Sequence, residues 1–66
     1  MPDRRDLMSN AEAARYVGLQ PASLTVMRHR GTFQVPYVKV GRRVMYDRRE
    51  LDRYLEERTV RPVQPD

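Results

Sequence analysis

The amino-acid sequence predicts one small α+β domain, mainly α, with its elements in the order helix, turn, helix, β-hairpin, helix. Three observations lead to this fold class: two segments with the sequence signature of a capped helix start, a proline in a helix-opening position between two glycine stops, and one stretch of strand-like alternation. With 66 residues, the chain has room for a single thin core. A domain below about 70–80 residues seldom gains more than about 3–5 kcal/mol from such a core.

The first helix is predicted over residues 10–17. Ser9 and Glu12 have the S-x-x-E spacing of a capping box, in which the serine hydroxyl accepts from the N–H of the third helical residue. The glutamate carboxylate then reaches back to the serine N–H. Gly18 is placed to end the helix in a left-handed conformation.

The second helix is predicted over about residues 21–30. Pro21 is suited to the first helical position, where its missing N–H needs no partner. Leu24 and Met27 lie three residues apart and form an apolar pair, and Gly31 ends the segment. Two short helices joined by about four residues form the pattern of a helix-turn-helix, although other small α domains also contain two short helices.

A β-hairpin is predicted after the second helix. Residues 35–40 are rich in β-branched and aromatic side chains, and Pro36 restricts this strand to a sheet edge or to a start beyond the proline. Gly41 and Arg42 supply a tight turn, and residues 43–46 form the returning strand.

The third helix follows the hairpin. Asp47 and Glu50 repeat the capping-box spacing, with aspartate as the cap. Leu51 and Leu55 lie four apart on one apolar face. Residues 59–66 contain two prolines and no periodicity, and they are expected to form a flexible tail.

These elements divide the chain into an N-terminal arm over residues 1–8, a folded domain over 9–58 and the tail over 59–66. The expected core consists of Leu7, Ala14, Val17, Leu19, Leu24, Met27, Phe33, Val38, Val44, Tyr46, Leu51 and Leu55.

Basic side chains are concentrated in the middle of the chain. Residues 15–49 contain eight basic side chains and one acidic side chain, a net charge of +7. Residues 1–14 contain two basic and three acidic side chains, and residues 50–66 contain three basic and five acidic ones. A preference for arginine codons explains arginine over lysine but not this concentration. The central segment is therefore expected to bind a polyanion such as nucleic acid.

The composition of the chain excludes several kinds of catalytic and metal site. The chain has no cysteine, which excludes disulfides, thiolate zinc sites and a cysteine nucleophile, and its one histidine, His29, excludes a histidine-based metal cluster. Ser23 and His29 lie about 240° apart around one helix and cannot form a nucleophile–base pair. We expect no enzyme, no cofactor and no metal site. No apolar run approaches the roughly 18 residues that span a membrane, and no secretory segment follows Met1, so we expect an intracellular protein.

Three blocks of the sequence resemble the excisionase family of helix-turn-helix proteins. They are residues 7–19 (LMSNAEAARYVGL), residues 38–43 (VKVGRR, followed by Tyr46) and residues 51–55 (LDRYL), so the resemblance covers about residues 7–57. The resemblance implies a small winged helix-turn-helix, related to the DNA-binding heads of MerR-type regulators. Phage excisionases, also called recombination directionality factors, bind adjacent sites on attachment DNA, bend it and recruit a tyrosine integrase.

The resemblance also implies which residues contact DNA. The second helix would lie in the major groove and the hairpin would act as a wing. The implied recognition-helix residues are Ala22, Ser23, Thr25, Val26, Arg28, His29 and Arg30, and the implied wing residues are Lys39, Gly41, Arg42 and Arg43. Arg28 and Arg30 are the expected phosphate contacts, and Arg42 is expected to enter a narrow minor groove. Ala22 and Val26, where relatives often carry charged residues, are suited to thymine methyl groups.

The expected partners are double-stranded DNA, a tyrosine integrase and other DNA-bound copies, in the cytoplasm of a bacterial host cell and not at a membrane. Two alternatives stay open. A small prophage-type, AlpA-like transcription regulator would have the same head and length. A protein-interaction module would use the exposed acidic helix and the tail, with arginines for solubility alone. Steep salt dependence of duplex binding would separate DNA binders from such a module.

Overall fold

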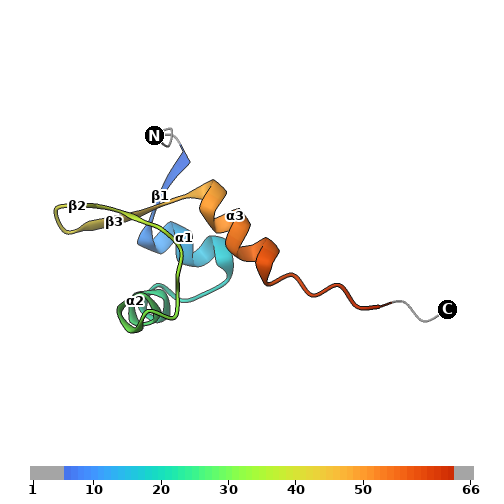
Figure 1. The fold of residues 1–66 in the computed structure, drawn as a ribbon. Helices are drawn as coiled ribbons and strands as arrows, with labels where there is room; N and C mark the ends of the chain where they lie inside the picture. The colour runs from blue at the N-terminus through green and yellow to red at the C-terminus, as the bar shows by residue number, and fades with distance from the viewer. Residues whose placement is uncertain (1–5, 64–66) are drawn as a thin grey trace.

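The computed structural model describes residues 6–63, which form three helices and a three-stranded antiparallel sheet (Figure 1). The elements are β1 (Leu7–Ser9), α1 (Asn10–Val17), α2 (Pro21–Arg30), β2 (Val38–Val40), β3 (Arg43–Asp47) and α3 (Arg48–Glu57). This confirms the predicted α+β class and is consistent with a winged helix-turn-helix. Residues 1–5 of the expected arm and 64–66 of the expected tail lie outside the described residues.

Both ends of α1 follow from the local sequence. The Ser9 hydroxyl accepts from the Glu12 N–H at 3.1 Å, and the Glu12 carboxylate accepts from the Ser9 N–H at 3.1 Å. The hydrogen bond from the Ser9 N–H stabilises the ionised carboxylate and lowers the pKa of Glu12. Gly18 ends the helix at φ 85°, in the left-handed region that glycine adopts without strain. The predicted capping box and helix bounds are therefore confirmed.

The second helix also has the predicted bounds. Pro21 occupies its first turn, and Gly31 ends it at φ 75°. After Gly31 the chain reverses, and the N–H groups of Thr32 and Phe33 both donate to the Met27 carbonyl, at 2.9 and 3.2 Å. This tight exit turns the chain back towards the core and begins the segment that leads to the hairpin.

The sheet has the order β1-β3-β2, with β3 in the centre. The hairpin is confirmed, and β2 begins beyond Pro36, as the restriction on proline predicted. The strand β1, which pairs with the other side of β3, was not predicted. Leu7 pairs with Asp47 and Ser9 with Met45, so part of the segment assigned to the N-terminal arm is an edge strand.

The third helix begins with a simpler cap than predicted. The Asp47 carboxylate accepts from the Arg49 N–H at 2.9 Å and from the Arg49 guanidinium at 3.0 Å. These bonds lower the pKa of Asp47. The Glu50 carboxylate, which a capping box would direct back to Asp47, instead lies 3.8 Å from the Arg53 guanidinium. The helix start is as expected, but the reciprocal capping box is wrong.

Seven apolar side chains form the buried core between the helices and the sheet. They are Ala13, Ala14, Leu24, Phe33, Val35, Tyr46 and Leu51. The Phe33 ring meets Tyr46 edge-on at 5.6 Å between centroids and lies 4.7 Å from Tyr54. The aromatic contacts therefore join the segment after α2 to both the central strand and α3.

The core prediction is correct for Ala14, Leu24, Phe33, Tyr46 and Leu51. Half-buried side chains of four further expected residues pack against this core: Val17, Leu19, Met27 and Val44. Leu7 and Leu55 are half-buried outside it. The prediction is wrong for Val38, which is 36% exposed, because every residue of β2 lies on a projecting edge strand. It also missed Ala13 and Val35.

The described part of the tail leaves α3 and extends away from the body of the domain (Figure 1). The Thr59 hydroxyl donates to the Leu55 carbonyl at 2.8 Å, and Val60 and Val63 are 85% and 94% exposed. The flexibility of the tail stays a prediction. None of the helices within residues 6–63 has the length and apolar character needed to cross a membrane.

Leu24 fixes α2 to the core, so its truncation should unfold the domain more easily. Leu24→Ala is expected to lower the free energy of unfolding by about 2–5 kcal/mol. Val26→Ala, at a position 46% exposed on the same helix, should change it by less than about 0.5 kcal/mol. Denaturant unfolding measures both. A Leu24→Ala variant as stable as the parent would contradict this assignment of the core.

Candidate nucleic-acid interface

The second helix presents one face to the core and another to solvent. Leu24 is fully buried and Met27 half-buried, which orients the helix. The exposed side chains are Ala22, Ser23, Val26, His29 and Arg30. No acidic side chain occurs in α2, and its last turn carries Arg28, His29 and Arg30. The outward face is therefore apolar near the helix start and basic near its end.

The hairpin tip and the end of α2 share one groove. Its lining consists of Arg28, His29, Tyr37, Lys39, Gly41, Arg42 and Val44. The structure thus brings three expected wing residues together with two expected helix residues. Arg30 and Arg43 are exposed but do not line this groove. The cations of the groove come from two different elements, so the positive potential extends across both.

The turn at the hairpin tip exposes Arg42. Val40 pairs with Arg43, which leaves Gly41 and Arg42 as a two-residue loop. Gly41 has φ 59°, and the positive φ at the first loop residue is what a type II′ hairpin turn requires. A side chain at this position would strain the turn even though the space around it is open. The glycine therefore fixes the direction in which Arg42 leaves the sheet.

Arg28 makes contacts within the protein. Its guanidinium donates to the Asn10 side-chain carbonyl at 2.7 Å and to the Tyr46 hydroxyl at 3.4 Å. It also lies 5.8 Å from the centroid of the Tyr37 ring. These contacts connect α1, α2 and β3. The phosphate contact expected of Arg28 stays a prediction, and such a contact must compete with these bonds.

Thr25 belongs to the same network. Its hydroxyl accepts from the Asn10 amide at 3.2 Å and donates to the Pro21 carbonyl at 3.1 Å. Both hydrogen-bonding directions of the hydroxyl are therefore used inside the domain. Of the seven residues expected on the recognition helix, Thr25 and Arg28 are the two whose side chains are hydrogen-bonded to Asn10 of α1.

Two residues of this surface were missed by sequence reasoning. Tyr37 is 47% exposed in the groove and its ring lies 5.9 Å from that of Tyr46. A tyrosine hydroxyl is a common donor to DNA phosphates. Its position two residues before Lys39, on the same face of an alternating segment, was a usable signal. Asn10 was also missed, and no local signal could have indicated its bonds to residues on another helix.

The one acidic side chain within residues 15–49 does not offset the basic surface. Asp47 is hydrogen-bonded to both the backbone and the guanidinium of Arg49. Its charge is therefore compensated at the start of α3. The basic character predicted for the centre of the chain is retained on the side formed by α2 and the hairpin.

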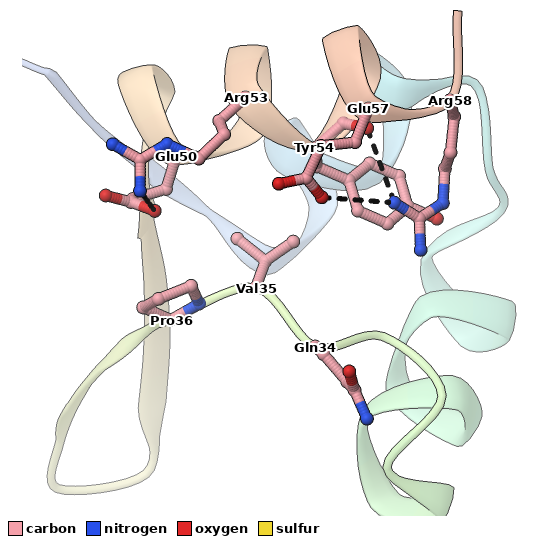
Figure 2. A pocket seen from close by; sticks show the side chains of 8 residues that line it. All are labelled: Gln34, Val35, Pro36, Glu50, Arg53, Tyr54, Glu57 and Arg58. Atoms are coloured by element: carbon pink, nitrogen blue, oxygen red, sulfur yellow. Dashed lines mark hydrogen bonds and ion pairs between the residues drawn. The ribbon is translucent and has the colours of Figure 1, made fainter.

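A second groove has a different character. Figure 2 shows it between residues 34–36 and α3, where the side chain of Val35 points towards the helix. Glu50 lies 3.8 Å from Arg53, and Glu57 lies 3.9 Å from Arg58. Because each carboxylate faces an arginine, this groove is less suited to phosphate than the basic groove. Within residues 6–63, no group of three or more metal-binding side chains is clustered.

Comparison with known protein families supports the assignment of α2 and the hairpin to a helix-turn-helix domain. A family described as a helix-turn-helix domain matches residues 7–59, from β1 to just beyond α3. Comparisons with curated proteins and with solved structures gave no match. The family match includes α1, α2, the hairpin and α3. The chain therefore belongs to the helix-turn-helix domain family, which includes small excisionase-like proteins, and this membership supports binding to DNA.

Proposed function

We propose that this protein is an excisionase-type accessory factor that performs no chemistry itself. It would bind adjacent sites on attachment DNA, bend the DNA and direct a tyrosine integrase towards excision in a bacterial host cell. The basic surface formed by the last turn of α2 and the hairpin carries the DNA-binding part of this proposal, because Arg30 is exposed at the end of the helix and Lys39 and Arg42 line the groove on the hairpin. The excisionase part rests on the resemblance of residues 7–19, 38–43 and 51–55.

The geometry supports simultaneous contact with two grooves of a duplex. In this arrangement α2 lies in the major groove, and Arg42 reaches the adjacent minor groove from the hairpin tip. Narrow minor grooves have an enhanced negative potential that attracts arginine. Phosphate contacts from Arg30, Lys39 and Arg43 would supply most of the affinity, so binding should depend steeply on salt.

Bending follows from the same arrangement. A small domain that holds a helix and a wing at fixed separation favours DNA whose neighbouring grooves curve to meet both. The cost of bending is offset by the added contacts. Specificity would then depend on the shape and deformability of the DNA as well as on base edges.

The tail offers a surface for protein partners away from the proposed DNA-binding surface. The described part of the tail extends away from α2 and the hairpin tip (Figure 1). Its two valines are almost fully exposed and are thus open to an integrase or to a neighbouring DNA-bound copy. These partners are part of the proposal.

Footprinting on the attachment DNA beside the gene, with and without the integrase encoded nearby, tests the proposal. Repeated, phased protections with enhanced cleavage between them are the expected result. One isolated palindromic footprint at a promoter would replace the excisionase role with that of an AlpA-like regulator. If duplex binding showed no salt dependence, the DNA-binding role itself would be wrong and a protein-interaction module would be favoured.

Arg42→Ala should weaken binding to all duplexes and reduce the slope of log affinity against log salt by about 1, because one cation that displaces counterions from the duplex is lost. Arg53→Ala is the matched control, since Arg53 lies on α3 beside Glu50 and away from the basic groove. Its slope should equal that of the parent. An unchanged slope for Arg42→Ala would remove Arg42 from the contact set.

Arg28→Ala tests a positioning role that its internal contacts support. We expect a lower melting temperature and weaker DNA binding with the salt slope unchanged, because Arg28 acts by holding α2 against Asn10 and Tyr46. Arg30→Ala should show the opposite pattern, with unchanged melting and a slope reduced by about 1. A reduced slope for Arg28→Ala would return Arg28 to the phosphate contacts.

A further inference from the structure

The first half of α2 exposes an apolar patch that the basic groove does not include. Ala22, Ser23, Val26 and Met27 line a shallow depression on the outward face of the helix, and its lining is mainly apolar. Val26 is 46% exposed at the centre of this face. An exposed valine on an isolated surface would need no explanation. Here the patch lies on the helix that is proposed to enter the major groove.

The positions of these side chains form a stripe along the helix. Ala22, Val26 and Arg30 are spaced four residues apart and so lie on the same face. With a rise of about 1.5 Å per residue, Ala22 and Val26 are separated by roughly 6 Å along the axis. The rise of DNA is about 3.4 Å per base pair. Side chains at this separation can reach neighbouring base pairs.

Few polar groups remain in the middle of this helix to read bases by hydrogen bonding. Thr25 and Arg28 are bonded to Asn10 within the domain. Ser23 is the polar side chain that accompanies the two apolar ones at the helix start. The strong base-reading side chains, Arg, Asn and Gln, do not occur among residues 21–27.

The surroundings of the patch indicate a polyanionic partner. The helix carries no acidic side chain, and its last turn is basic. Lys39 and Arg42 stand on the neighbouring hairpin and line the groove with the end of α2. An apolar patch beside cations matches a surface that presents apolar groups beside phosphates. The major groove has this property at thymine, whose C5-methyl group is its characteristic apolar contact.

We propose that α2 selects its DNA through thymine methyl groups contacted by Ala22 and Val26. This inference rests on the proposed DNA-binding function and specifies which base that surface reads. Thymine would be preferred over cytosine at one or two positions in each site. Because a methyl contact involves no phosphate, it should add discrimination without adding to the salt dependence.

Replacement of thymine by deoxyuridine is the direct test, because it removes only the methyl group. The preferred site is first selected from random duplexes, and each thymine in it is then replaced singly. We expect about fourfold weaker binding at one or two positions, the value of one buried methyl group. The salt slope should not change. Replacements at the flanks of the duplex serve as the DNA control.

A matched pair of variants links this effect to the helix. In Val26→Ala the uracil penalty at one sensitive position should fall from about fourfold to less than about twofold, because part of the contacting surface is gone. Val40→Ala is the control, since Val40 is an exposed valine on the hairpin. It should retain the full penalty. Because both valines are exposed, both variants are expected to fold.

The outcomes separate this inference from the function on which it rests. Salt-dependent binding that is indifferent to uracil at every position would overturn the thymine selection and leave DNA binding intact. A complete loss of salt-dependent duplex binding would overturn both. A uracil penalty that Val26→Ala leaves unchanged would assign the selection to other residues. If the parent protein self-associates in sedimentation and Val26→Ala abolishes this without any uracil effect, the patch is a protein interface and the thymine selection is overturned.

Discussion

Tyr46 is the side chain on which the relative placement of α2 and the hairpin depends. It is fully buried on β3, the strand that pairs with both other strands. Its ring contacts Phe33 and Tyr37, and its hydroxyl accepts from Arg28. One residue thus joins the sheet, the exit of α2 and the helix itself. In a domain with so few buried side chains, a fixed angle between helix and wing needs such a shared contact.

The sequence predicted the elements whose causes are local. The bounds of α1 and α2 follow from Ser9, Pro21 and the glycines that come after each helix, because caps act within one turn. The strand β1 could not be predicted, since it forms only by pairing with β3, far away in the chain. Val38 was misplaced in the core because alternation alone does not tell an edge strand from a covered one.

For the candidate site, the sequence indicated which residues are basic but not which of them are committed elsewhere. Arg28 and Arg30 have the same charge, and although Arg28 lies four residues after Leu24 on the inward side of the helix, this spacing does not show which group it contacts. The difference arises from Asn10, which lies on another helix and has an acceptor at the right distance. The prediction of a basic centre was nevertheless informative, because the charges on α3 and the tail are largely compensated in ion pairs such as Arg48–Asp52 and Arg61–Glu56. Such exposed pairs add little stability.

The length of the hairpin would determine which DNA geometry fits the proposed interface. Its loop consists of Gly41 and Arg42, and its inner end is fixed by Tyr46. Adding one residue to each strand would turn the side chains beyond the insertion to the opposite face, so only additions of two residues per strand preserve the direction of Arg42. Each such addition would carry Arg42 about 7 Å outward, roughly two base pairs. Under the proposed function, the separation between α2 and Arg42 could therefore change only in steps of about two base pairs, and the present hairpin length would fit one such separation.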